Sequence, residues 1–198
     1  RNIKLNMDTM VENTPIDTST ELFGRSFAFP LMTAPIGSIK LQFNPTDDVS
    51  DFNEKCMAAC ESRGTVHCYS TGLETIVHDA AIASRRAHGN CGIPVINPES
   101  DENIIAQMER CKAEQAPAAI CVVVDSAGLP HLKAMHGTGG TKSVEQLKLL
   151  SEEAKVPFIV KGIMTAKSAL KAVEAGADAV LVSNHGGRVL DGCAATAE

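Results

Sequence analysis

The sequence has no tryptophan and a single tyrosine, Tyr69, so it offers few aromatic platforms on which nucleobases could stack. Acidic residues outnumber basic ones, 24 against 18, which gives a formal net charge of -6. Proteins that bind nucleic acid usually present a basic face. The composition therefore argues against nucleic acid as a partner.

Long hydrophobic runs are also missing. No apolar run approaches the roughly 20 residues of a membrane span, and no signal-peptide pattern opens the sequence. The seven cysteines are odd in number and lack CxxC spacing, which argues against a disulfide framework and against a zinc site. We therefore expect a cytoplasmic protein with reduced thiols, no membrane span and no bound metal.

Short apolar segments rich in β-branched residues recur along the 198 residues. They lack polar alternation, which is typical of strands buried on both faces of a parallel sheet. Helical patterns lie between them, and a repeated β–α unit implies either a closed barrel or an open doubly wound sheet. The six expected strands are Pro30–Ile36, Thr65–Ser70, Gly92–Asn97, Ala118–Asp125, Pro157–Lys161 and Asp178–Asn184.

Five helices are expected between these strands. Acidic residues at Asp101 and Glu102 suit the positive N-terminus of a helix, while Thr165 and Gly176 suit the two ends of another. The expected helices are Val49–Ser62, Leu73–Ala83, Asp101–Gln115, Ser143–Ala154 and Thr165–Ala175.

Every expected strand ends in polar or glycine-rich residues, which helps to choose between the two architectures. An open sheet concentrates its ligand at one crevice, whereas a barrel gathers residues from many strand ends on one face. The second arrangement fits better. We expect a TIM (β/α)8 barrel of which about six β/α units are present, as one domain over residues 1–198. A hairpin over Ser19–Phe29, turning at Gly24-Arg25, would plug the bottom of this barrel.

The longest loop, Ser126–Lys142, is interpreted as a plain connector or as a mobile lid. Its glycine-rich run at residues 137–140 lacks the GK[ST] ending of a phosphate-binding loop and does not directly follow a strand. The sequence therefore does not predict a phosphate site here.

The most informative stretch is Pro157–Asp191, where two expected neighbouring strands end in reactive side chains. One strand ends at Lys161 and the other in SNHGGR, residues 183–188. This stretch closely resembles the FMN-dependent α-hydroxy-acid oxidases and dehydrogenases, which include glycolate oxidase and lactate oxidase. GRSFAFPLMTAPIG, residues 24–37, resembles that family's first barrel strand and the hairpin before it. The resemblance implies a barrel with bound FMN that oxidises a 2-hydroxy acid to a 2-oxo acid.

The resemblance also implies roles for three residues. His185 would take the hydroxyl proton of the substrate while hydride passes to the flavin. Asp125 would hydrogen-bond this imidazole and stabilise its protonated form. Arg188 would bind the substrate carboxylate through its planar guanidinium. The residues alone leave structural alternatives: a buried histidine, an aspartate that caps a turn, and an arginine paired with Asp191.

Cofactor contacts follow from the same resemblance. Lys161 would stabilise the negative charge that reduction places on the flavin. Backbone at the end of the first strand would lie against the flavin ring, and two serine hydroxyls would bond to it. These further cofactor-binding residues are Pro35, Ile36, Gly37, Ser70 and Ser183.

Several positions depart from the family pattern. Val95 and Asn97 stand where members carry a glutamine and a tyrosine, and Val123 stands in place of a threonine. A second arginine of the family has no counterpart in residues 126–133. The proton-transfer residues are thus retained while half of the carboxylate clamp is lost, which argues against glycolate or lactate as the substrate. An FMN-dependent isomerase and an inactive barrel fragment are the alternative interpretations.

The remaining expectations concern the partners of the protein and the part of the barrel that the sequence covers. The resemblance implies a small-molecule 2-hydroxy acid as substrate, oxygen or a redox carrier as electron acceptor, and a homo-oligomer, because members are often tetramers. The seventh and eighth strand exits, which hold the FMN phosphate in members, are missing from the sequence. We therefore expect a truncated chain or one part of a longer protein.

Overall fold

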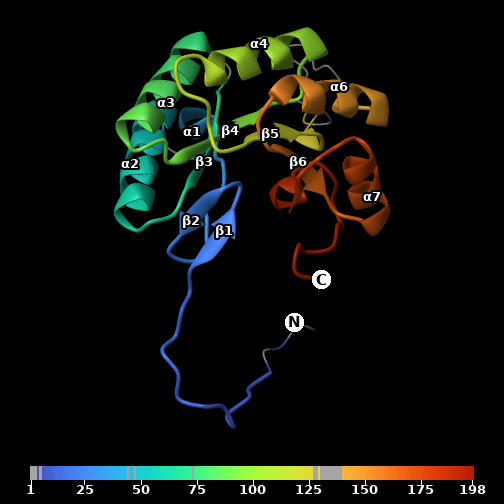
Figure 1. The fold of residues 1–198 in the computed structure, drawn as a ribbon. Helices are drawn as coiled ribbons and strands as arrows, with labels where there is room; N and C mark the ends of the chain where they lie inside the picture. The colour runs from blue at the N-terminus through green and yellow to red at the C-terminus, as the bar shows by residue number, and fades with distance from the viewer. Residues whose placement is uncertain are drawn as a thin grey trace.

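The computed structural model describes residue 4 and residues 6–43, 45–46, 48–72, 74–126, 129 and 140–198. Its main sheet has five parallel strands in the order β3-β4-β5-β6-β7. Each strand therefore pairs with the one that follows it in the chain, and helices make the crossovers. Figure 1 shows these helices arranged around the outside of the sheet. The strands span His67–Ser70 (β3), Gly92–Ile96 (β4), Ile120–Val123 (β5), Phe158–Ile163 (β6) and Ala179–Val182 (β7).

Local capping signals set several helix boundaries. The expected helix Val49–Ser62 is confirmed to the residue as α2. Ser143 precedes α6 and forms a capping box: its hydroxyl accepts from the Gln146 amide, and the Gln146 side chain accepts from the Ser143 amide. The described helices are α1 Ile39–Gln42, α2 Val49–Ser62, α3 Thr75–Ala87, α4 Asp101–Lys112, α6 Val144–Ala154 and α7 Ala166–Glu174.

Two helices end several residues away from the expected position. The helix expected over Leu73–Ala83 is α3, which begins at Thr75 and continues to Ala87. Arg85 lies in its last turn, and the buried guanidinium donates to the carbonyls of Cys111 and Gln115. Helix α4 stops at Lys112, before the expected end at Gln115. The backbone turns there, because Glu114 adopts a φ of 65°, outside the right-handed helical region.

The first expected strand, Pro30–Ile36, is wrong as a strand. Only Thr33 pairs with the sheet, through an isolated parallel bridge to His67. Proline has no amide hydrogen to donate to a ladder, and both Pro30 and Pro35 lie in this segment. Among the described residues, the sheet therefore has five strands and one bridge where six strands were expected.

The hairpin expected over Ser19–Phe29 is present as β1, Thr20–Leu22, and β2, Arg25–Phe27. Its turn lies at Phe23 and Gly24, with φ of 52° and 68°, and not at Gly24-Arg25. Two positive φ values suit a two-residue hairpin turn because its twist matches that of the strands. Arg25 instead pairs with Leu22 in the ladder.

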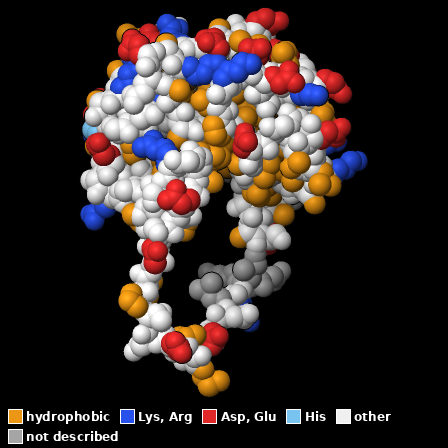
Figure 2. Space-filling view, in the orientation of Figure 1, with side chains coloured by type: hydrophobic (Ala, Val, Ile, Leu, Met, Phe, Trp, Pro, Cys, Tyr) orange, Lys and Arg blue, Asp and Glu red, His pale blue; other side chains and the backbone are white. Residues whose placement is uncertain are grey.

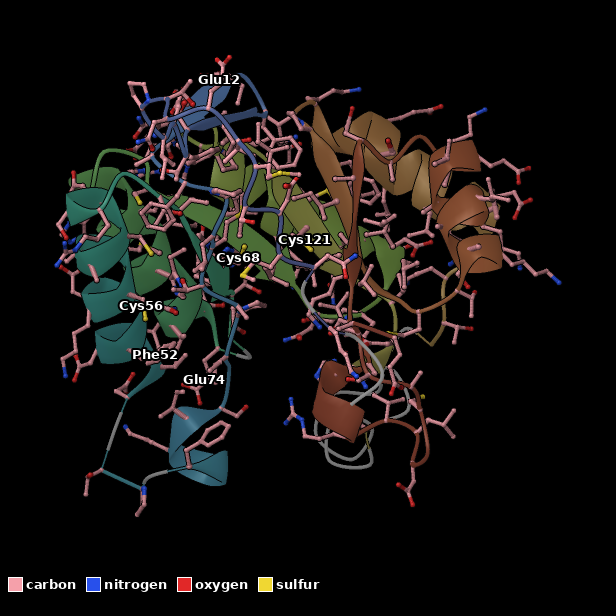
Figure 3. The ribbon with its side chains drawn as sticks, turned by 90° about the horizontal axis from the view of Figure 1, so that it is seen from below. Glu12, Phe52, Cys56, Cys68, Glu74 and Cys121 are labelled. Carbon is pink, nitrogen blue, oxygen red and sulfur yellow. The ribbon has the colours of Figure 1, made fainter. Side chains whose placement is uncertain are left out.

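The two faces of the sheet build two cores. One cluster joins outward side chains such as Val122 and Val160 to the helices, while another lies inside the curve of the sheet. Cys68 and Cys121, from β3 and β5, belong to this inner cluster and lie inside the curve in Figure 3. Phe27 of the hairpin packs into the same cluster. The hairpin thus covers the end of the interior where the strands begin.

One region of the described surface is apolar. Leu170 and Val173 of α7 and Val182 of β7 are 71%, 65% and 49% exposed. Figure 2 shows hydrophobic side chains gathered low on the body, on the side where α7 lies in Figure 1. Among the described residues, β7 pairs with β6 alone, so its other edge is open. No helix in the described part of the chain is long and apolar enough to cross a membrane.

A buried polar chain ties the segment around Thr33 to the sheet. His67 is fully buried; its Nδ1 lies 2.6 Å from Thr33 Oγ1 and its Nε2 lies 3.1 Å from Asn53 Oδ1. Asn53 Nδ2 in turn reaches the carbonyl of Ser70 at 3.5 Å. Burial lowers the pKa of His67 from 6.5 to about 4, so the folded state holds this imidazole neutral.

This burial predicts an acid-sensitive fold. Between pH 6.5 and 5 the unfolded His67 binds a proton that the folded one excludes, so the free energy of unfolding should fall by roughly 1–2 kcal/mol as the pH decreases. Urea unfolding of the complete protein at several pH values measures this. His67→Gln should flatten the dependence.

His88 is the control, with the opposite sign. Hydrogen bonds to Glu54 and Glu61 raise the pKa of His88, so its contribution to stability is present at low pH and fades as the pH rises. His88→Gln should therefore steepen the acid loss. If His67→Gln left the pH dependence of the free energy of unfolding unchanged, His67 would not be a source of the acid sensitivity.

Candidate active site

The strand ends surround a cavity of about 490 Å³, a size typical of small-molecule and cofactor sites. Parallel strands bring the residues that follow them to one edge of a sheet, so residues far apart in the sequence meet here. Eight of the nine predicted site residues line the cavity: Pro35, Ile36, Gly37, Ser70, Lys161, Ser183, His185 and Arg188.

Asp125, the ninth predicted residue, lies behind His185. Its Oδ1 is 2.9 Å from Nδ1 of the imidazole, and the two side chains are only 12% and 14% exposed. A carboxylate at this nitrogen holds the proton on Nδ1 and leaves Nε2 as the basic nitrogen of the neutral ring. Asp125 Oδ2 is buried, and it has no hydrogen-bond partner among the described residues. Within that part of the chain, the carboxylate bonds to His185 alone.

The loop that carries His185 has an unusual backbone. His185, Gly186 and Gly187 adopt φ of 57°, 69° and 74° in succession. A histidine in the left-handed region is uncommon and persists where the surroundings hold it. The Asn184 side chain accepts from the Gly187 amide at 3.2 Å, and Arg188 Nε donates to the His185 carbonyl at 3.2 Å. The loop is thus fixed in a shape that presents the imidazole to the cavity.

Lys161 of β6 and Ser183, which directly follows β7, are joined by a hydrogen bond next to this loop. Lys161 Nζ donates to Ser183 Oγ at 3.1 Å, and the His185 amide donates to the same oxygen at 3.1 Å. The lysine is 8% exposed, and no carboxylate of the described residues lies within 4.0 Å of its Nζ. A buried cation without a carboxylate is costly. The site therefore suits an anionic ligand, such as the reduced flavin expected from the sequence.

The opposite wall is formed by backbone. Pro35, Ile36 and Gly37 line the cavity, and a Cβ on Gly37 would lie 2.9 Å from Ser70 Oγ. Ser70 is 8% exposed, and its hydroxyl accepts from the Gly72 amide at 3.2 Å. Backbone packed this closely, with a hydroxyl at its edge, fits a flat ring system with polar atoms on its rim. The donor set and the wall together fit FMN.

The departures from the family pattern gather on the same cavity. Val95, Asn97 and Val123 all line it. The two valines make the wall apolar where members carry polar side chains, while Asn97 keeps a polar group there. Arg188 is the one arginine among its lining residues in the described part of the chain. His131 and Lys133 are the basic residues in the stretch where the family's second arginine would stand, and they could supply a second cation. They lie outside the described residues, as does most of the Ser126–Lys142 loop.

Several apolar residues of the cavity were not among the predicted site residues: Ala34, Phe43, Leu129, Leu181 and Val182. Strand alternation could have found Leu181, because it lies two positions before Ser183 and so shares its face. Leu129 belongs to the long loop, and Phe43 directly follows α1. Neither of these two has a periodic signal that points toward the cavity.

Comparison with known proteins identifies relatives. The family model for FMN-dependent dehydrogenases matches residues 1–139 and 131–198. A peroxisomal (S)-2-hydroxyacid oxidase of Arabidopsis thaliana is 29% identical, over 99% of this chain and 61% of its own length. A 2-hydroxyacid oxidase of Dictyostelium discoideum is 26% identical, over 99% of this chain and 57% of its own. The chain thus spans less than two thirds of the length of these relatives.

A solved structure agrees in fold. The structure of a mandelate oxidase with 3,3-difluoro-2-hydroxy-3-phenylpropionic acid matches with a TM-score of 0.72 at 22% identity, over 96% of this chain and 58% of that one. The likeness confirms the expected (β/α)8 barrel fold, of which the described strands form one part.

The geometry around Ser183 generates a prediction. Ser183→Ala removes the acceptor shared by Lys161 Nζ and the His185 amide, so two buried donors lose a partner. We expect a loss of about 1–3 kcal/mol in the free energy of unfolding and faster hydrogen exchange at the His185 amide. Urea unfolding and exchange monitored by NMR measure the two effects in the complete protein.

Ser151→Ala is the matched control, because the Ser151 hydroxyl makes one exposed hydrogen bond, to the Gly176 carbonyl. It should change stability by less than Ser183→Ala and leave exchange at His185 unaltered. Equal effects of the two substitutions would contradict the bridging role of Ser183.

Proposed function

The chain belongs to the FMN-dependent dehydrogenase family, and we propose that the protein containing it oxidises a 2-hydroxy acid to a 2-oxo acid. One observation carries the proposal. The Asp125–His185 pair, joined at 2.9 Å, meets the buried Lys161 and the guanidinium of Arg188 around a single cavity. This set provides a base, a cation for a reduced cofactor and a carboxylate-binding group within one site.

His185 acts as the general base. Because Asp125 fixes the proton on Nδ1, Nε2 carries the lone pair that takes the hydroxyl proton of the substrate. The resulting imidazolium lies against the Asp125 carboxylate, which stabilises the new positive charge. The strained loop conformation keeps the imidazole in place before the substrate arrives.

Arg188 binds the substrate carboxylate, since its planar guanidinium can donate two parallel hydrogen bonds. FMN, when bound, supplies the acceptor for the hydride that leaves the substrate carbon. Lys161 provides positive charge where reduction makes the cofactor anionic. The residues that would hold the cofactor line the cavity and are Pro35, Ile36, Gly37, Ser70, Lys161 and Ser183.

The lining of the cavity favours a class of substrate. Val95 and Val123 make the wall apolar, which suits a 2-hydroxy acid with an apolar side chain better than glycolate. Either oxygen or a redox carrier could serve as the electron acceptor. A homo-oligomer and a cytoplasmic location stay as proposals on the grounds given by the sequence.

Anaerobic reduction of the flavin tests the proposed function. The complete protein with FMN should lose its yellow absorbance on addition of lactate, 2-hydroxyisocaproate or mandelate, and more slowly with glycolate. The rate of bleaching, followed by stopped-flow absorbance, measures the reductive step without any electron acceptor. A spectrum unchanged by every acid in the panel would contradict the proposal and favour an FMN-dependent isomerase or an inactive protein.

A substitution tests the assigned base. His185→Asn should lower the rate of flavin reduction about 10²–10⁴-fold, because general base catalysis is lost, while FMN remains bound. His88→Asn is the control, because His88 pairs with Glu54 and Glu61 on the surface and lies outside the cavity lining. His88→Asn should leave the rate unchanged. An active His185→Asn protein would overturn the role of His185.

A further inference from the structure

The Asp125–His185 contact has to cross an intervening strand. Asp125 follows β5 and His185 follows β7, and β6 lies between these two strands in the sheet. The carboxylate nevertheless reaches Nδ1 at 2.9 Å. The Asp125 side chain must therefore pass over β6, and it does so at Gly162.

The strand is irregular at Gly162. Lys161 pairs with Leu181 and Ile163 pairs with Val182, so one extra residue interrupts the ladder between β6 and β7. On the other side, the β5 ladder ends where the Val124 amide donates to the Lys161 carbonyl at 2.9 Å. Gly162 has a φ of 106°, a conformation that favours glycine. These features define a β-bulge, a device known to redirect side chains near active sites.

The bulge changes which face the side chains of β6 occupy. Ile159 belongs to the inner cluster, and Lys161 lines the cavity on the same side. Regular alternation would place Ile163 on this inner side as well. Ile163 instead packs with Val160 in the outer cluster, against the helices. Lys161 thus points inward by regular alternation with Ile159, and the extra residue after it removes the next side chain from the path of Asp125.

Asp125 lies directly on the bare backbone of Gly162. A Cβ at position 162 would be 2.6 Å from Asp125 Cγ, 2.7 Å from its Cβ and 2.9 Å from its amide nitrogen. Two of these three atoms belong to or adjoin the backbone, so a rotation of the carboxyl group cannot relieve the overlap. Any side chain at position 162 must displace Asp125.

We propose that Gly162 is a positioning residue, whose missing side chain lets the Asp125 carboxylate cross β6 and hold His185. Displacement would break the hydrogen bond between Asp125 and His185, and the buried Oδ2 has no other partner among the described residues to hold the carboxylate in place. The consequence for catalysis rests on the proposed function, whereas the geometric claim stands without it.

Gly162→Ala in the complete FMN-loaded protein tests the inference through two readouts. Flavin reduction should slow by about 10²-fold, the effect of a small misplacement of a reacting group. The same variant in an Asp125→Ala background should add little further loss, because the two changes remove one interaction. In ¹H–¹⁵N NMR spectra of the imidazoles, the hydrogen-bonded Nδ1–H signal of His185 should disappear in Gly162→Ala as it does in Asp125→Ala.

Gly176→Ala is the matched control. Gly176 also has a positive φ, 85°, and a Cβ there would lie 3.0 Å from Ser151 Oγ, away from the cavity. This variant should carry comparable backbone strain yet keep the His185 Nδ1–H signal and the rate of flavin reduction.

A thermodynamic cycle covers the case in which Gly162→Ala folds poorly. Asp125→Gly removes the side-chain atoms that the new Cβ would meet, so Gly162→Ala should destabilise this background less than the parent. Equal destabilisation in both backgrounds, or a wild-type Nδ1–H signal in Gly162→Ala, would overturn the inference. If no 2-hydroxy acid reduces the flavin but the signal and the cycle behave as expected, the proposed function fails and the positioning role stands.

Discussion

The hydrogen bond between Asp125 and His185 is the contact on which the rest of the site depends. It joins the ends of β5 and β7 at 2.9 Å, fixes which ring nitrogen carries the proton and supplies the negative charge that a protonated imidazole needs. This hydrogen bond can form only if β6, the strand between β5 and β7, leaves room for it. The β6 strand must present Lys161 to the cavity and then no side chain at Gly162, which a bulge with φ of 106° achieves.

Buried charge and backbone strain are balanced within the same few residues. Lys161 is nearly buried without a carboxylate among the described residues, and His185 occupies the left-handed region at φ 57°. Ser183 contacts both, because its hydroxyl accepts from the lysine and from the His185 amide. The cation and the loop therefore share one acceptor oxygen. A buried cation of this kind lowers the stability of the fold unless an anionic ligand offsets its charge.

Much of this architecture could be predicted from the sequence. Buried apolar runs predict β3 to β7, and a capping residue such as Thr165 predicts a helix start, because both depend on local patterns. The segment Pro30–Ile36 carries an apolar run too, yet its prolines reduce it to one bridge at Thr33. The SNHGGR motif predicts where His185 and Arg188 lie. Gly162 could not be found in this way, since a bulge depends on the register between strands.

We propose that one cavity places a 2-hydroxy acid between His185 and Arg188, beside FMN. The most direct measurement is a crystal structure of the complete protein with FMN and a bound 2-oxo acid product. We expect the product carboxylate on the Arg188 guanidinium, its 2-oxo oxygen within hydrogen-bond reach of His185 Nε2, and Lys161 against the flavin. A product carboxylate bound away from Arg188, or a flavin that does not contact Lys161, would contradict the proposal.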